Sequence, residues 1–164
     1  MSTMQGSLDL LQDPIAQRLL QAPIPARVAY TWLDGTPRVV PIWFHWDGQE
    51  IVLATPLDAP KVKALAHNPT VAVTIDEDKW PSKVLLVRGI ATVTTINGVV
   101  AEYAAAAERY FGPEQGRAWV AQAGNLMPQM ARIAIRPEWV GVLDFEQRFP
   151  SALERAMARA QTGE

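Results

Sequence analysis

The chain has 164 residues, of which 49% are hydrophobic and 20% are charged, and its formal net charge is −2. This composition is typical of a globular protein that buries one core, and the slight acidity argues against nucleic acid as a partner. The absence of cysteine excludes disulfides, thiolate catalysis and cysteine-ligated metals. There is no apolar run of membrane-spanning length and no basic segment before an apolar one. We therefore expect a cytoplasmic protein that has no contact with a membrane.

The N-terminal part of the chain predicts a helical arm over residues 1–24. Leucine and isoleucine recur at helical spacing between residues 8 and 21, with a break near Pro14. Pro23 and Pro25 end the arm, because proline cannot continue a helix.

Three strands and one short helix follow the arm. Asp-Gly pairs at residues 34–35 and 47–48 predict tight turns between the strands. The predicted strands cover residues 27–33, 38–46 and 51–55, and the helix covers residues 59–67 with Asp58 as its N-cap.

The second half of the chain again mixes strands and helices. Gly89 predicts a bulge in one strand and Pro137 predicts a break in another. The strands cover residues 70–76, 83–96 and 130–145, and the helices cover residues 98–111 and 114–123. A C-terminal segment, residues 147–164, contains an amphipathic helix from Ser151. Six strands joined mostly by short connections predict a mainly β (α+β) fold, an antiparallel barrel with peripheral helices in one domain over residues 1–164.

The sequence contains no pattern of a self-sufficient catalytic site. The two histidines, His45 and His67, lie on different predicted elements, and no metal-binding or nucleotide-binding motif is present. We therefore predict no catalytic residue and no metal. If the protein is an enzyme, a cofactor supplies the reactivity and the protein supplies binding and orientation.

The strand over residues 38–46 has an unusual residue in its middle. Pro41 cannot donate a hydrogen bond to a neighbouring strand, so this strand is expected at a sheet edge or at a bulge. Free backbone groups at an edge can bind a planar ring, but proline at an edge also prevents aggregation. The sequence leaves both interpretations open.

Lys61 lies in the first turn of its predicted helix, where cations are disfavoured and anions are favoured. Thr55 precedes it by six residues, so a hydroxyl and an ammonium group are available to bind one phosphate. The alternative is a solvated lysine that pairs with Asp58. Lys83 and Arg88, on one later strand, are further candidates for contact with a cofactor.

Four segments in a fixed order resemble one family. They are PRVVPIWFHWDG, then IVLAT with a lysine six residues after its threonine, then VLLVRGIATV, then RIAIRPEWVGVLDF. Over residues 26–145 the chain resembles the pyridoxamine 5′-phosphate oxidase-like, FMN-binding split-barrel superfamily. The resemblance implies a six-stranded antiparallel split β-barrel that forms a homodimer with cofactor at the subunit interface.

The resemblance also implies which residues bind the cofactor. The segment 38–43 would line the flavin ring and ribityl chain, Lys61 would anchor the phosphate, and Lys83 (or Ser82) would contact the flavin. The full implied set is Arg38, Val39, Val40, Pro41, Ile42, Trp43, Ala54, Thr55, Lys61 and Lys83.

Two departures from the family pattern affect the expected activity. Pro60 stands where vitamin-oxidising members have an arginine, and no arginine-rich segment follows Phe145. We therefore do not expect a true pyridoxamine phosphate oxidase. The resemblance implies an FMN-binding oxidoreductase that transfers hydride or electrons between the flavin and a small organic substrate. The alternatives are an F420 (deazaflavin)-dependent reductase of the same fold and a non-catalytic flavin-binding or carrier module.

Overall fold

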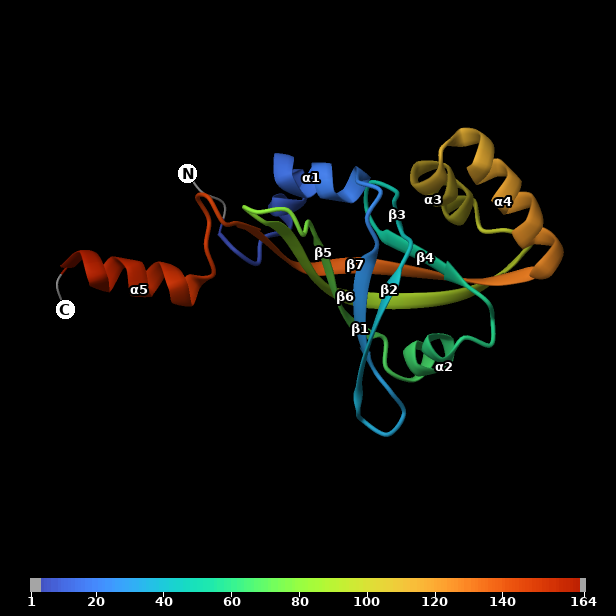
Figure 1. Cartoon of the computed structure of the whole chain (residues 1–164). Helices are drawn as coiled ribbons and strands as arrows, with labels where there is room; N and C mark the ends of the chain where they lie inside the picture. The colour runs from blue at the N-terminus through green and yellow to red at the C-terminus, as the bar shows by residue number, and fades with distance from the viewer. Residues whose placement is uncertain (1–3, 163–164) are drawn as a thin grey trace.

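The computed structural model describes residues 4–162 and contains one antiparallel sheet in this range. The sheet order is β2-β1-β5-β6-β7-β4-β3. The strands are β1 (Ala26–Thr31), β2 (Pro37–Ile42), β3 (His45–Trp46), β4 (Ile51–Thr55), β5 (Thr70–Asp76), β6 (Lys83–Asn97) and β7 (Gln129–Asp144). The helices are the 3-10 helix η1 (Leu8–Gln12), then α1 (Pro14–Gln21), α2 (Pro60–His67), α3 (Ala101–Phe111), α4 (Pro113–Leu126) and α5 (Ser151–Thr162) (Figure 1).

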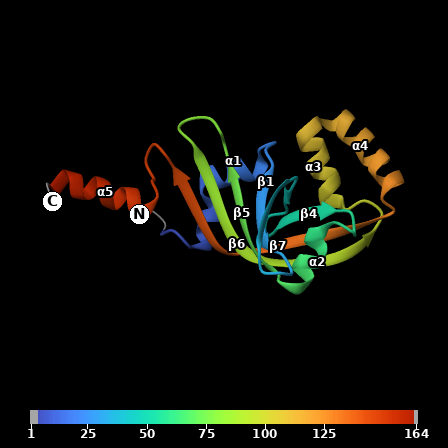
Figure 2. The same cartoon turned by 60° about the horizontal axis from the view of Figure 1, so that its bottom comes forward.

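The predicted fold class is confirmed, and the described sheet has seven strands rather than six. The difference arises at Trp43 and Phe44, which divide the expected strand 38–46 into β2 and β3. These two strands are the opposite edges of the sheet, although only two residues separate them in sequence. The sheet must therefore curl until its edges meet, which gives a split barrel (Figures 1 and 2).

Pro41 lies in the edge strand β2, as its sequence context predicts. It is opposite Arg27 of β1 and is exposed. The other side of β2 pairs with no strand in the sheet order, so the missing N–H of proline disrupts no second ladder.

The long hairpin of β6 and β7 contains the predicted bulge at Gly89. The register shifts between Arg88 and Gly89, where Gly89 faces Pro137 and Arg88 faces Trp139. A Cβ atom on Gly89 would lie 2.2 Å from the backbone oxygen of Arg136. The expected break at Pro137 is wrong, because proline fits at the bulge and β7 runs through it.

The N-terminal arm packs its apolar side onto the barrel. Leu10, Leu19 and Leu20 are fully buried with the strand residues of the main core. The break near Pro14 is confirmed, since Asp13 caps α1 and Pro14 is its first residue. The first three residues of the predicted arm lie outside the described range.

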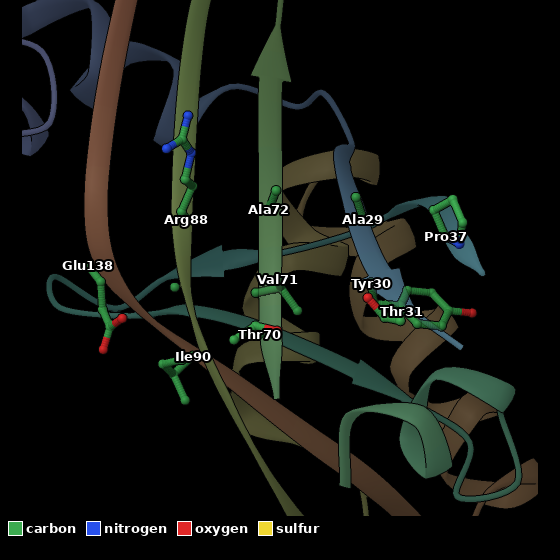
Figure 3. Close-up of a pocket in the computed structure, with 11 residues that line it drawn as sticks. Ala29, Tyr30, Thr31, Pro37, Thr70, Val71, Ala72, Arg88, Ile90 and Glu138 are labelled. Carbon is green, nitrogen blue, oxygen red and sulfur yellow. The ribbon is translucent and has the colours of Figure 1, made fainter. Parts of the chain in front are cut away.

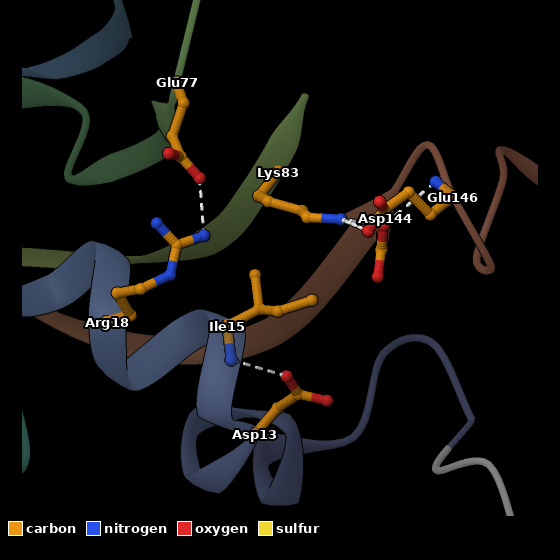
Figure 4. Close-up of polar contacts among 7 residues, drawn as sticks. All are labelled: Asp13, Ile15, Arg18, Glu77, Lys83, Asp144 and Glu146. Carbon is orange, nitrogen blue, oxygen red and sulfur yellow. Dashed lines mark hydrogen bonds and ion pairs between the residues drawn. The ribbon is translucent and has the colours of Figure 1, made fainter. Parts of the chain in front are cut away.

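Polar contacts fix the arm to the open end of the barrel (Figure 4). Arg18 of α1 lies 2.5 Å from Glu77, which follows β5, and Asp13 Oδ1 accepts the N–H of Ile15 at 2.9 Å. The guanidinium of Arg148 lies 2.9 Å from the other oxygen of Asp13. The arm therefore joins the ends of β5 and β7.

The helix expected from Ser151 is present as α5. All its residues are exposed, and it projects away from the barrel in both views (Figures 1 and 2). The predicted C-terminal segment continues to residue 164, and residues 163–164 lie outside the described range. No helix within residues 4–162 combines the length and the apolar character needed to cross a membrane.

Candidate cofactor site

Lys61 is placed by the junction between β4 and α2. Thr55 is the last residue of β4 and is buried, and Lys61 is the second residue of α2. The Lys61 ammonium donates a hydrogen bond to the Thr55 hydroxyl over 3.2 Å. The six-residue spacing in the sequence thus brings these two side chains together.

The predicted N-cap of this helix is wrong. Ala59, not Asp58, occupies the N-cap position, and no side chain caps the helix there. Pro60 begins α2, where its fixed φ angle suits the first helical position. The first turn therefore presents N–H groups that no capping side chain of the described chain satisfies.

The surroundings of Lys61 favour an anionic ligand. Burial lowers the pKa of the Lys61 ammonium below its ordinary value of 10.5. No acidic side chain among residues 4–162 forms an ion pair with it, so the pairing with Asp58 is not found. An anion bound beside Lys61 would supply the missing countercharge.

A cavity of about 360 Å³ opens beside Lys61. Among the described residues that line it, Lys61 is the only charged one, and most of the others are apolar or aromatic. The lining residues are Pro41, Ile42, Trp43, Ala54, Thr55, Pro56, Lys61, Tyr103, Trp119, Met127 and Met130. Six of the ten predicted cofactor residues therefore meet at one cavity.

The other four predicted residues do not line this cavity. Arg38 hydrogen-bonds Thr36 at the far end of the β1–β2 hairpin, Val39 is 65% exposed, and Val40 packs against the barrel core. Lys83 forms ion pairs with Asp144 and Glu146 at the start of β6 (Figure 4). Contact of these four with a cofactor stays a prediction.

The helical hairpin of α3 and α4 supplies cavity residues that the sequence analysis missed. The Trp119 indole donates a hydrogen bond to the Tyr103 hydroxyl over 2.7 Å. The Trp43 ring stacks on Tyr110 with centroids 5.1 Å apart and lies 5.7 Å from Tyr103. Tyr103 and Tyr110 are seven residues apart, a spacing that places both on one helix face and is visible in the sequence.

An ion pair fixes α3 beside the cavity. The Arg132 guanidinium of β7 donates two hydrogen bonds, of 2.6 and 3.0 Å, to the same carboxylate oxygen of Glu102. The hydrogen bond from Arg132 lowers the pKa of Glu102. Arg132 faces Ala54 across the β4–β7 pair, so this contact holds the helical wall against the cavity floor.

His45 does not line the cavity. It lies on β3, and burial lowers the pKa of its imidazole. Within the described residues, no group of three or more histidines, aspartates and glutamates is arranged to bind a metal ion. The described side chains therefore provide one lysine and an aromatic wall beside the same cavity.

Three solved structures are similar to this chain. An F420 reductase shares 26% identity, with 76% of this chain and 94% of that chain covered and a TM-score of 0.60. A conserved hypothetical protein from Mycobacterium tuberculosis shares 18% identity over 87% and 91% of the two chains, with a TM-score of 0.66. The heme storage protein HutZ from Vibrio cholerae shares 16% identity over 80% and 93%, with a TM-score of 0.58. The last two show the fold alone.

A sequence profile completes the comparison. No curated protein matches the sequence. The profile described as "Pyridoxamine 5′-phosphate oxidase" matches residues 13–144, which is most of the chain. This match includes the barrel, the Lys61 junction and the helical hairpin. The chain therefore belongs to the pyridoxamine 5′-phosphate oxidase superfamily, as the order of its motifs indicated.

Proposed function

We propose that this protein is an oxidoreductase that binds a flavin-type cofactor in the cavity beside Lys61, and that the preferred cofactor is the deazaflavin F420. One observation carries the proposal. A half-buried lysine, bonded to one hydroxyl and lacking an acidic partner in the described chain, is the sole charge in an aromatic cavity. Such a site suits a phosphate attached to a large apolar ring.

The charge at the phosphate position favours F420 over FMN, although the further carboxylates of the F420 tail would need cations beyond Lys61, which is the sole charged residue of the described cavity lining. The phosphate of FMN is a monoester, whose charge at pH 7 is about −1.5 to −2 by analogy with other phosphomonoesters. The phosphate of F420 is a diester with one negative charge, which one lysine neutralises. Pro60 stands where the resemblance implies a second cation, the arginine of vitamin-oxidising members. The 26% identity to an F420 reductase, over 94% of that chain, supports the same choice.

FMN is the second candidate, because the superfamily resemblance implies it. In that case a second subunit would have to contribute a cation to the phosphate. The edge strand β2 supports the proposed homodimer, since Val39 and Pro41 are exposed on this edge and Pro41 also lines the cavity. We accordingly propose that the cofactor lies at an interface between two copies.

The protein's own residues bind and orient the reactants in this proposal. When bound, the cofactor supplies hydride chemistry. The Tyr103 hydroxyl accepts a hydrogen bond from Trp119, so its own proton stays available for a ligand in the cavity. Trp43, Tyr103 and Trp119 would exclude water from one side of the bound ring and of a small organic substrate.

Retention of cofactor on gel filtration tests the proposal. Protein is incubated with F420 or with FMN, separated from free cofactor, and scanned for the visible absorption of each. We expect one F420 per chain and weaker retention of FMN. Retention of neither cofactor would contradict the proposal, and stronger retention of FMN would overturn the argument from phosphate charge. Protein-dependent oxidation of reduced cofactor by a small quinone would then separate an enzyme from a carrier.

A further inference from the structure

Trp43 lines the cavity from a short connection between two strands. Together with Phe44 it joins β2 to β3, and its side chain is half-buried. Aromatic side chains of the α3–α4 hairpin surround its ring. The Tyr110 ring is stacked on it with centroids 5.1 Å apart, and the Phe111 ring stands nearly perpendicular to it at 4.9 Å. The orientation of this part of the cavity wall therefore depends on the helical hairpin.

Arg109 is a cation that α3 places beside the same connection. Its guanidinium carbon lies 4.8 Å from the ring centroid of Phe44 and 5.0 Å from that of Tyr110. Arg109 Nη2 donates a hydrogen bond to the backbone oxygen of Phe44. Within residues 4–162 Arg109 forms no ion pair, and its Nε is buried without a hydrogen bond. Two aromatic rings and one carbonyl oxygen therefore contact this cation in place of a carboxylate.

Tyr110 connects Arg109 to Trp43. The Tyr110 and Trp43 rings are nearly parallel, with an interplanar angle of 16°, and the Tyr110 hydroxyl donates a hydrogen bond to the backbone oxygen of Ile24 over 2.7 Å. The contacts thus run from Phe44 through Arg109 and Tyr110 to Trp43. Neither Arg109 nor Tyr110 lines the cavity, so they reach its shape through Trp43.

Packing alone does not account for an arginine at this position. A buried Nε without a partner costs stability, and an apolar side chain of similar length would avoid that cost. The planar guanidinium, however, can donate to the Phe44 oxygen and lie over an aromatic ring at the same time. This combination fixes the strand connection and the Tyr110 ring relative to each other.

We propose that Arg109 is a positioning residue for the cavity: by holding Phe44 and the Tyr110 ring together, it fixes the orientation in which the Trp43 ring forms the wall. The use of this wall by a cofactor rests on the proposed function, whereas the orientation of Trp43 does not. A wall that is already fixed loses little side-chain freedom when a planar ring binds against it. Removal of Arg109 should therefore weaken binding of the ring and leave the phosphate contact of Lys61 unchanged.

Fluorine NMR of the protein without cofactor, labelled with 5-fluorotryptophan, tests the orientation of Trp43. The chain has six tryptophans, and the signal that is lost in Trp43→Phe belongs to Trp43. We expect Arg109→Met to shift and broaden this signal. The signals of Trp32 and Trp139 should stay in place, which also shows that the barrel remains folded. An unchanged Trp43 signal in folded Arg109→Met would overturn the proposal.

Arg88 offers a matched control for the spectrum. Its guanidinium carbon lies 4.1 Å from the ring centroid of Trp139, and it lines a separate hollow over β1, β5 and β6 (Figure 3). Arg88→Met should therefore move the signal of Trp139 and leave that of Trp43 in place. A Trp43 signal that moves as far in Arg88→Met as in Arg109→Met would reflect a general loss of charge and would contradict the proposal.

Arg109→Lys covers the case in which Arg109→Met does not fold. Lysine keeps a positive charge in the last turn of α3, where it suits the helix dipole. It cannot, however, donate to the Phe44 oxygen and lie flat over the Tyr110 ring at once. We expect a displaced Trp43 signal and unchanged signals from Trp32 and Trp139. A Trp43 signal like that of wild type would show that charge at the helix end suffices, and the positioning role would be wrong.

Titration with F420, and with the same deazaflavin lacking its phosphate and tail, separates the wall from the anchor. Arg109→Met should raise the dissociation constants of both ligands by about two- to tenfold, the scale of an aromatic contact. Lys61→Met should weaken the binding of F420 alone. Arg117→Met removes an exposed cation of α4 and should bind both ligands like wild type.

The outcomes of this titration distinguish the two proposals. Equal affinities of wild type and Arg109→Met for both ligands would overturn the positioning role and leave the proposed function intact. Failure of wild type to bind either ligand would overturn the proposed function, and the spectrum of the protein without cofactor would then decide whether Arg109 orients Trp43.

Discussion

Lys61 is expected to destabilise the protein without cofactor and to stabilise the complex with an anionic cofactor. Its ammonium is half-buried in the first turn of a helix, and burial lowers its pKa. The helix dipole adds to this cost, because its N-terminal end is positive. An anion bound in the cavity would reverse both effects, so the same lysine would stabilise the proposed complex.

The first prediction concerns the stability of the protein without cofactor. A lysine whose folded pKa is lowered loses its proton more readily in the native state, so native stability rises with pH up to the unfolded value near 10.5. Lys61→Met removes this effect. We expect the variant to be at least as stable as wild type at pH 8, with the difference shrinking towards pH 10.5.

Urea denaturation at both pH values measures this difference. The matched control is Lys63→Met on the same helix, where the lysine is exposed. A Lys61→Met variant that is clearly less stable than wild type at pH 8 would show that the lysine supports the empty fold.

The sequence predicts the proximity of some site residues and not of others. Thr55 and Lys61 lie at adjoining ends of one strand and one helix, so their spacing fixes their proximity. Tyr103 and Trp119 approach Trp43 only because the α3–α4 hairpin folds back over the sheet. That contact joins distant parts of the chain, and no local pattern in an alanine-rich helix reveals it.

At the scale of elements, strands and helices were predictable where periodicity was strong, and the bulge at Gly89 was predicted correctly, whereas errors arose at Pro137 and at the N-cap before Pro60. Considered without its strand partner, Pro137 predicts a break in the strand over residues 130–145. Opposite Gly89 it occupies a bulge, where a missing N–H is tolerated. Asp58 resembles an N-cap in sequence, but the helix begins one residue later at Pro60.

The second prediction concerns the bulge in β6. Gly89→Ala places a Cβ atom 2.2 Å from a backbone oxygen of β7, and that strand cannot move without breaking its ladder. We expect a loss of at least about 2 kcal/mol in the free energy of unfolding. Thr92→Ala, on the exposed side of the same strand, should change it by less than about 0.5 kcal/mol. Chemical denaturation of both variants gives the comparison, and similar stabilities would refute the steric argument.

The whole molecule is held together by a short connection between its two edge strands and by contacts between segments that are far apart in sequence. The two edge strands meet because Trp43 and Phe44 join them, and the arm adds ion pairs across the barrel end. An antiparallel barrel follows from six strand-like segments with short connections. The seventh strand arises where Trp43 and Phe44 interrupt the expected strand 38–46, and the local residue pattern does not predict that interruption.

The third prediction concerns acid stability. Hydrogen bonds from Arg18 and Arg132 lower the pKa values of Glu77 and Glu102, respectively. Their stabilisation is therefore present above the ordinary carboxyl pKa of 4.5 and is lost as pH falls through the lowered folded values. Glu102→Gln should cost about 1 kcal/mol at pH 7 and less below pH 4. Unfolding curves between pH 3 and 7 test this, and a cost independent of pH would rule out the ionic contribution.

Isothermal titration of F420 into wild type, Lys61→Met and Lys63→Met tests the central claim most directly. Loss of a charge-assisted hydrogen bond of about 1.5–3 kcal/mol predicts a dissociation constant about 10–150 times higher for Lys61→Met. Lys63→Met should bind like wild type, because its lysine is exposed and lies outside the cavity. Equal affinities for wild type and Lys61→Met would contradict the assignment of Lys61 as the phosphate anchor.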